Sequence, residues 1–221
     1  FNQFKPLAEG PLKLRLEKLV ERLQFKIRAV YVMDSSRRSS HSNAYFSGFG
    51  RTKSIVLFDT LVETLNEKQT EAVVAHEIGH QRLYHVPKHL ILTMFITFLG
   101  LWLTSVLLRH PPLFAAFGFH SESAGQISAH GVFIILFLLS GPAGSLVQPL
   151  LNCWLRHHEY DADLFSARAT GGSQALVAAL INLSKDNLSN PNPHPLYSAI
   201  HHTHPPLILR LSWIQKQTKS S

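Results

Sequence analysis

The sequence predicts a mainly α-helical, integral membrane protein with a small β-sheet and two transmembrane helices. Two long uncharged apolar runs, Leu90–Leu108 and Ile127–Leu151, are the first observation, because about 20 apolar residues in a helix cross the hydrocarbon core of a bilayer. Helical periodicity through most of the remaining chain is the second. Three short β-rich runs before residue 60 are the third, and they predict the sheet.

The composition excludes several classes of site. The net charge of +7 comes from 21 basic and 14 acidic residues, but the basic residues are scattered and form no stripe with interleaved aromatic residues. We therefore expect no nucleic-acid partner and assign the excess charge to the membrane surface. The single cysteine, Cys153, excludes an internal disulfide and a Cys-rich zinc site, so any metal needs His and carboxylate ligands. The chain opens with Phe1 and has no signal-peptide pattern, so we expect it to be part of a longer protein.

The region before the first apolar run predicts two helices around a small sheet. Leucines at helical spacing predict an amphipathic helix over Pro11–Phe25. The runs AVYVM, NAYFSGF and SIVLF predict strands, and the short GRTK connection between the last two predicts a hairpin. Asn66 is a suitable N-cap for a helix over Glu67–Leu83, whose acidic first turn suits a helix N-terminus.

The two apolar runs predict a transmembrane hairpin. The first spans roughly 30 Å as a helix, and the second, which contains GPAG, is expected to bend at Pro142. The alternative is a pair of buried helices in a soluble protein. Two crossings joined by a loop over Arg109–Gln126 return the chain to the side it left. The sequence thus divides into residues 1–89, the membrane hairpin 90–151, and a helical part 152–221, and its first and last parts can meet.

After the second run, the sequence predicts three further segments. A polar helix containing RHHEYDADLFSARAT ends at Gly171 and Gly172, and another helix follows through Ser184. Residues 187–195 are expected to form a loop. A last helix restarts at the prolines of HHTHPPLILRL.

The run His76-Glu77-Ile78-Gly79-His80 is a metal-binding pattern. Two histidines four residues apart lie on one helical face and can share a metal ion, and Glu77 lies one step round to reach the water on that ion. This is the HExxH pattern of zincin peptidases, and it falls inside a predicted helix. The alternative is a pair of surface histidines.

A catalytic zinc ion needs a third protein ligand and one open position. The segment EYDAD follows the second predicted span and lies on the same membrane side as HEIGH. Glu159 can bind the metal while Asp163, four residues later on the same face, orients a ligand imidazole. His157 and His158 are rival ligands, but adjacent side chains cannot both point one way. Asp161 is expected to lie on a solvated face.

Five stretches carry a more specific resemblance, namely SSHSNAYF, IVLFDTL, HEIGH, EYDADLFSA and THPPLILRL, with the two predicted spans between the third and fourth. In this order they resemble the C-terminal half of the eukaryotic CAAX prenyl endopeptidases, zinc proteases of the endoplasmic reticulum and inner nuclear membrane. The resemblance covers essentially the whole chain and is closer than that to bacterial heat-shock membrane proteases. It implies further transmembrane helices before this region, which help to enclose an intramembrane chamber.

The resemblance implies the same central residues that the chemistry selects. His76, His80 and Glu159 are expected to hold one Zn²⁺ ion, Glu77 to act as the general base, and Asp163 to be an active-site acidic residue. Many relatives have a neutral residue where this chain has Asp161.

Five further residues enter by resemblance alone. His204 and Arg210 are expected near the site, where His204 donates to the oxyanion of the tetrahedral intermediate. Considered without the resemblance, His204 is more typical of a surface histidine. The SNAYF strand is expected to be a sheet edge to which an extended peptide adds, so that Asn43, Ala44 and Tyr45 line the substrate. Otherwise this run is simply part of a hairpin.

The expected function is endoproteolysis of prenylated CAAX proteins at the membrane, with lipid as a second partner. Glu77 takes a proton from the zinc-activated water, and the peptide is cut after the lipid-bearing cysteine, releasing the C-terminal tripeptide. Two alternatives stay open at this point. One is a membrane quality-control protease without a prenyl requirement, and the other is a non-catalytic membrane interaction module with a structural metal. The open fourth position and Glu77 argue against the second alternative.

Overall fold

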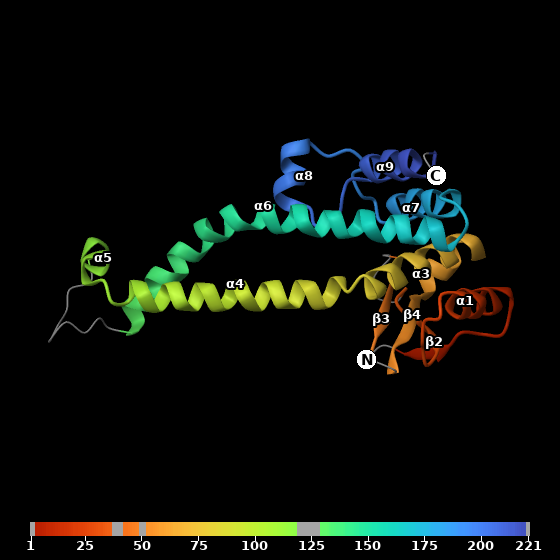
Figure 1. The fold of residues 1–221 in the computed structure, drawn as a ribbon, viewed down its shortest axis with the longest axis horizontal. Helices are drawn as coiled ribbons and strands as arrows, with labels where there is room; N and C mark the ends of the chain where they lie inside the picture. Colours follow the sequence, from red (N-terminus) through yellow and green to blue (C-terminus); the bar gives the residue numbers. More distant parts are fainter. Residues whose placement is uncertain (1–2, 37–41, 49–51, 119–128, 220–221) are drawn as a thin grey trace.

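The computed structural model describes residues 3–36, 42–48, 52–118 and 129–219. Helices dominate these residues, and the strands form a four-stranded sheet. Figure 1 shows an elongated molecule in which a body holds the sheet and both chain ends, and an arm of two long helices projects from it. The predicted class, mainly helical with a small sheet, is confirmed.

The sheet has the strand order β1-β2-β4-β3, where β1 is Phe4–Pro6, β2 Val30–Met33, β3 Ala44–Ser47 and β4 Ser54–Phe58. The hairpin of β3 and β4 is antiparallel, as the short connection predicts, whereas β2 and β4 are parallel. Sequence reasoning missed β1, because its three residues are all exposed and give no apolar pattern. In this strand order β3 lies at an edge of the sheet, which matters for the site.

The main core joins the sheet to several helices. Helix α1 spans Pro11–Arg22 and buries Leu16 and Leu19 completely. It ends before the predicted Phe25, because Gln24 has a φ of 47° and leaves the helix. Helix α2, Asp59–Thr64, follows β4 directly.

The chain then forms α3, Glu67–Arg82, and α4, His85–Leu107. Between them Tyr84 adopts a φ of 57° and ψ of 35°, so α4 starts in a new direction, five residues before the predicted span. The segment expected to be a loop contains a short helix, α5, Pro111–Ala116. The rest of that expected loop, residues 119–128, lies outside the described residues.

Helix α6, Ala129–Ala169, joins the second apolar run and the EYDAD segment in one element. Its 41 residues extend roughly 60 Å, about twice the thickness of a hydrocarbon core. Figure 1 shows it bending in its N-terminal half, which contains Pro142 and Pro149, whereas its C-terminal half reaches α3. One helix therefore connects the arm to the site.

Three shorter helices complete the body, namely α7 (Gln174–Asp186), α8 (Pro195–His201) and α9 (Leu207–Lys219). Helix α9 begins directly after Pro205 and Pro206, as predicted. Helix α8 was not predicted, because its seven residues carry no helical apolar stripe.

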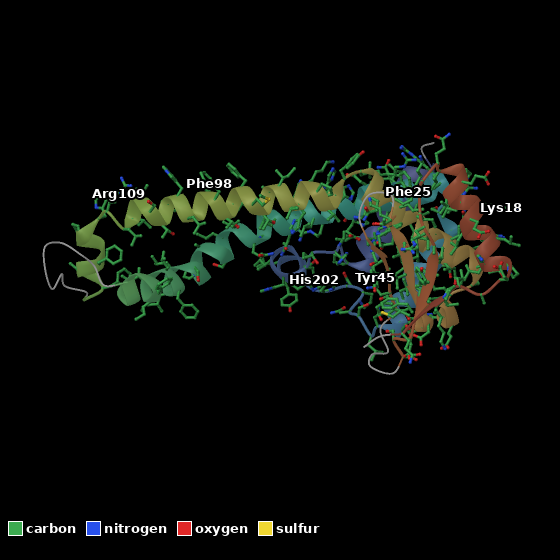
Figure 2. All side chains as sticks on the ribbon, turned by 90° about the horizontal axis from the view of Figure 1, so that it is seen from below. Lys18, Phe25, Tyr45, Phe98, Arg109 and His202 are labelled. Carbon is green, nitrogen blue, oxygen red and sulfur yellow. The ribbon has the colours of Figure 1, made fainter. Side chains whose placement is uncertain are left out.

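The arm exposes apolar side chains. The most apolar window of α4 has none of its residues buried, and that of α6 has 6% buried, although both helices are long and apolar enough to cross a membrane. Phe98 is 67% and Phe137 80% exposed. Figure 2 shows Phe98 along the arm and Arg109 at its far end, opposite Lys18 in the body. This exposure does not fit the alternative of two helices buried in a soluble core.

Candidate active site

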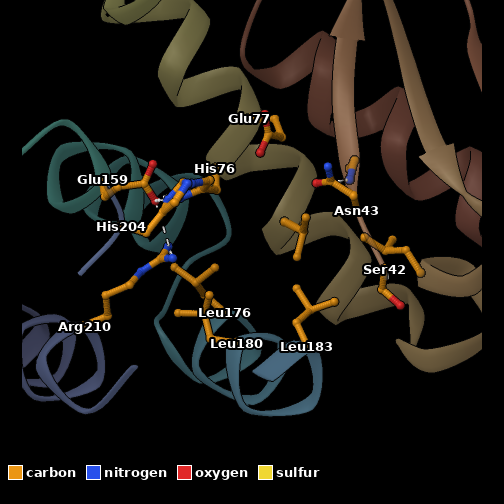
Figure 3. A pocket seen from close by; sticks show the side chains of 13 residues that line it. Ser42, Asn43, His76, Glu77, Glu159, Leu176, Leu180, Leu183, His204 and Arg210 are labelled. Carbon is orange, nitrogen blue, oxygen red and sulfur yellow. Dashed lines mark hydrogen bonds and ion pairs between the residues drawn. The ribbon is translucent and has the colours of Figure 1, made fainter. Parts of the chain in front are cut away.

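Helix α3 carries three of the predicted functional residues. A reciprocal capping box fixes its start: the side chain of Asn66 accepts from the backbone N–H of Gln69 at 3.0 Å, and that of Gln69 accepts from the N–H of Asn66 at 3.0 Å. The uninterrupted helix then brings His76 and His80 one turn apart, with their Nε2 atoms 3.1 Å from each other. Figure 3 shows Glu77 beside His76, on the side toward the sheet.

Glu159 reaches these histidines from α6. Its Oε2 lies 3.7 Å from Nε2 of His76, and its Oε1 lies 3.4 Å from Nε2 of His80. One ligand atom from each of the three side chains lies within 4.8 Å of the others, and within the described ranges no further group of this kind is found. Glu159 and His76 are buried and His80 is partly exposed, so the cluster is largely enclosed by protein.

The geometry of this cluster fits zinc. Ligand atoms about 2.0–2.1 Å from a tetrahedral zinc ion lie roughly 3.3 Å from one another. The Nε2 atoms of the two histidines lie 3.1 Å apart, and each lies near that spacing from a different oxygen of Glu159, His80 3.4 Å from Oε1 and His76 3.7 Å from Oε2. Two imidazoles and one carboxylate form a donor set typical of catalytic zinc, with a fourth position for water or substrate.

Close packing of α3 and α6 makes the cluster possible. At Gly79, within HEIGH, an added Cβ would lie 3.2 Å from side-chain atoms of Phe165. The buried Oγ of Ser166 in α6 donates to the carbonyl of Ala72 in α3 at 2.6 Å, and this hydrogen bond also joins the two helices. A small residue at position 79 therefore lets α6 deliver its carboxylate between the histidines.

Asp163 and Arg210 lie behind the cluster. Oδ1 of the fully buried Asp163 is 2.9 Å from Nδ1 of His76, and its two oxygens accept from Nη2 and, at 2.8 Å, from Nε of Arg210 on α9. Nη1 of Arg210 is also 3.4 Å from Oε2 of Glu159. Burial alone disfavours charge on His76, but Asp163 outweighs it and raises the pKa of His76. The same carboxylate, against the opposing effect of burial, raises the pKa of Arg210.

His204 approaches from the segment between α8 and α9. Its Nδ1 is 3.0 Å from Oε2 of Glu159, although its side chain is 69% exposed. The preceding helix is held by α6: Arg156 Nη1 donates to the carbonyls of Ser198, Ala199 and His202 at 3.3, 3.2 and 2.8 Å. These carbonyls lie at the C-terminal end of α8, where most carbonyls lack helical partners, although that of Ser198 also accepts from the N–H of His202. Arg156 thus anchors the segment that carries His204.

A cavity of about 140 Å³ opens beside the cluster (Figure 3). One wall is polar, one is the first residue of β3 with the two residues before it, and one is aliphatic. In that order the lining residues are His76, Glu77, Glu159, His204 and Arg210; Ser42, Asn43 and Ala44; and Leu61, Val73, Leu176, Leu180 and Leu183. The site can therefore hold a chain whose carbonyl faces the cluster and whose side chains are apolar.

The predicted substrate strand differs along its length. Asn43 and Ala44 line the cavity, and the Oδ1 of Asn43 accepts from the N–H of Ala44 at 2.8 Å. The ring of Tyr45 instead packs on Phe58, with 6.1 Å between ring centroids, and is absent from the cavity lining. Across the cavity, burial raises the pKa of Glu77.

The rival histidines lie outside the ligand cluster. The side chain of His157 is 73% exposed and lies 3.8 Å from the carboxylate of Asp161, itself 42% exposed. His158 is buried but stacks on His85, with 4.0 Å between ring centroids. Neither belongs to the group of ligand atoms around Glu159.

Sequence reasoning missed the contribution of α7. Its leucines at positions 176, 180 and 183 form the aliphatic wall, and their helical spacing was a signal that could have been used. At the end of α7, the carboxylate of Asp186 accepts from the hydroxyl of Ser42. Oδ1 of Asn187 accepts from the backbone N–H of Ser42 at 3.2 Å. Helix α7 therefore holds the start of β3 in place.

The chain is similar to known proteins along nearly its whole length. The profile of peptidase family M48 matches residues 6–218. The CAAX prenyl protease 1 homolog of Arabidopsis thaliana is 39% identical over 222 residues, which cover 100% of this chain and 51% of that protein. CAAX prenyl protease 1 of Saccharomyces cerevisiae is 41% identical over 223 residues, covering 96% of this chain and 49% of that protein.

The fold agrees with a solved structure as well. The crystal structure of S. mikatae Ste24p matches with a TM-score of 0.84 and 39% identity, over 97% of this chain and 52% of that one. The chain spans about half the length of the curated relatives it matches. These relatives confirm the resemblance to CAAX prenyl endopeptidases, and the chain belongs to peptidase family M48.

Proposed function

We propose that this chain is the zinc-bearing part of a membrane-embedded endopeptidase that removes the C-terminal tripeptide from prenylated CAAX proteins. His76, His80 and Glu159 hold Zn²⁺, and Glu77 is the general base. The observation that carries the proposal is the cluster of three ligand side chains, with one ligand atom from each within 4.8 Å of the others and Glu77 beside it at the cavity. A structural zinc site has no use for an open fourth position facing a cavity.

The chain's own residues supply the acid–base and positioning steps. A bound zinc ion lowers the pKa of its water and polarises the scissile carbonyl. Glu77 takes the proton of the attacking water and passes it to the leaving amide nitrogen. As an imidazolium, His204 donates Nδ1–H to Glu159 and Nε2–H to the developing oxyanion. Arg210 neutralises buried carboxylate charge behind the ligands, and Asp163 holds the ring of His76.

The walls of the cavity suit a CAAX terminus. The substrate backbone adds along the edge of β3 at Asn43, Ala44 and Tyr45, and the aliphatic residues of the tripeptide lie against the leucines of α7. The exposed apolar arm crosses the bilayer and lies beside the prenyl group. By the resemblance to CAAX prenyl endopeptidases, the proposed location is the endoplasmic reticulum membrane.

The test uses the full-length protein, its Glu77→Gln variant and a Glu67→Gln control. Glu67 starts the same helix, its side chain is 46% exposed, and it does not line the cavity. We expect zinc in all three, and a loss of about 10²–10⁴-fold in cleavage of a farnesylated CAAX peptide for Glu77→Gln only. Equal cleavage of the unprenylated peptide would favour a quality-control protease. Activity surviving in Glu77→Gln, or a parent without zinc, would overturn the mechanism.

A further inference from the structure

His85 is a buried imidazole that lies just outside the zinc ligands. It is 4% exposed, and its Nδ1 lies 3.0 Å from Nδ1 of His80. The other nitrogen of His80, Nε2, faces His76 and Glu159 at 3.1 and 3.4 Å. The two nitrogens of His80 therefore have separate partners, one in the ligand cluster and one behind it.

The backbone explains how His85 reaches this position. Residues five apart in a continuous helix point about 140° away from each other, so His80 and His85 could not meet on one helix. Here α3 ends at Arg82, and Tyr84 takes a left-handed conformation with φ 57° before α4 begins. The side chain of Tyr84 is 66% exposed, so its backbone turn is the feature that redirects His85 toward His80.

A second buried histidine fixes the ring of His85. His158, 6% exposed, stacks on it with 4.0 Å between centroids and 3° between ring planes. Trp154 packs edge-on against His158, with 4.2 Å between centroids. His158 precedes Glu159 in α6, so the helix that brings the third ligand also holds the ring behind the second.

We propose that His85 is a positioning residue for the zinc ligand His80, whose Nδ1–H it accepts, while the stack with His158 fixes its ring plane. This rests on the proposed zinc site. A neutral imidazole that binds metal through Nε2 carries its proton on Nδ1, so His80 must donate and His85 must accept. The two ligand histidines are then held differently, His76 by the carboxylate of Asp163 and His80 by a neutral ring.

Three substitutions in the full-length protein test this role through zinc affinity, measured by competition with a chelator. His85→Phe keeps a ring to stack on His158 but has no acceptor. His85→Asn keeps an acceptor near the place of Nδ1. His89→Phe makes the same replacement one turn later in α4, at an exposed residue that packs on Trp154.

We expect His85→Phe to lower zinc affinity by about 10–100-fold, His85→Asn to recover most of it, and His89→Phe to leave it unchanged. The recovery distinguishes positioning from packing, because Asn fills the space less well than Phe. Equal affinity of His85→Phe and parent, or an equal loss in both His85 variants, would overturn the inference while the zinc site itself stands. A parent without zinc would overturn the proposed function as well.

Discussion

The crossing of α3 with α6 and the arm formed by α4 with the first half of α6 use opposite chemistry. At the crossing, carboxylates, imidazoles and a guanidinium are buried and contact one another, as Asp163, Glu159, His76 and Arg210 do. Along the arm many large apolar side chains, such as Phe98 and Phe137, are exposed. One continuous helix, α6, takes part in both regions.

The difference shows where each region obtains its stability. A buried charge is tolerated only when it is paired and hydrogen-bonded, so the crossing depends on each partner being present. An exposed apolar helix depends on what surrounds it, and a bilayer satisfies its side chains without specific contacts. Substitutions at the crossing should therefore have large, specific effects, and equivalent ones on the arm small effects.

The largest effect is expected at Asp163. Asp163→Asn leaves Arg210 buried without its bidentate partner and should lower the free energy of unfolding by about 3–5 kcal/mol. It also removes the carboxylate behind His76, which should weaken zinc binding by about 10–100-fold. Thermal unfolding in detergent and chelator competition measure the two effects.

Asp161→Asn is the matched control, two residues earlier on the same helix. Its half-exposed carboxylate lies 3.8 Å from the exposed His157, so its loss should change stability by less than about 0.5 kcal/mol. Similar losses in both variants would mean that Asp163 acts only through general charge on α6.

Sequence predictability follows the same division. Features set by local spacing were predicted: the histidines of HEIGH share a face, EYDAD follows on a helix, and both apolar runs form long helices. Proline rules predicted a bend at Pro142, and α6 bends in the half that contains Pro142 and Pro149 while it stays one helix. Neighbouring groups compensate for a missing backbone hydrogen bond, and a sequence does not identify them.

Contacts that depend on an unexpected turn, or that join distant segments, could not be predicted from spacing. His85 meets His80 only because Tyr84 leaves the helical region, and Tyr is not a residue that signals a left-handed turn. Arg156 contacts α8 across more than 40 residues of chain, and no periodic pattern marks it. The ion pair between Asp163 and Arg210 was not predicted, although each residue was expected near the site.

A pair of truncations sharpens the contrast between core and arm. Leu16 is fully buried in α1, so Leu16→Ala should lower the free energy of unfolding by about 2–5 kcal/mol. Phe98→Ala removes a larger side chain, but one that is 67% exposed, and should cost less than about 0.5 kcal/mol. Both values come from thermal unfolding of the full-length protein in one detergent. A large loss in Phe98→Ala would show that protein rather than lipid covers this face of α4.

A smaller effect is expected from two glycines. Gly79→Ala gains about 1 kcal/mol of helix propensity but places a methyl group 3.2 Å from Phe165, so a net loss of about 1–2 kcal/mol and weaker zinc binding should follow. Gly100→Ala, in α4, meets no atom within 4 Å and should not destabilise the protein. Melting temperatures compare the two. An unchanged Gly79→Ala would mean that α6 need not approach α3 so closely.

The smallest effect is expected at Arg156, which acts on the site from a distance. Nη1 of Arg156 donates to three carbonyls at the α8 end, and lysine keeps the charge but not the planar guanidinium that places this nitrogen among them, so Arg156→Lys should loosen the segment carrying His204. We expect kcat/KM to fall about tenfold, or ~1.4 kcal/mol, with zinc affinity unchanged. Arg168→Lys, at an exposed residue later in α6, is the control.

If Arg156 works through His204, the double variant Arg156→Lys/His204→Ala should be no slower than His204→Ala alone. Additive losses would instead place the action of Arg156 elsewhere in the site.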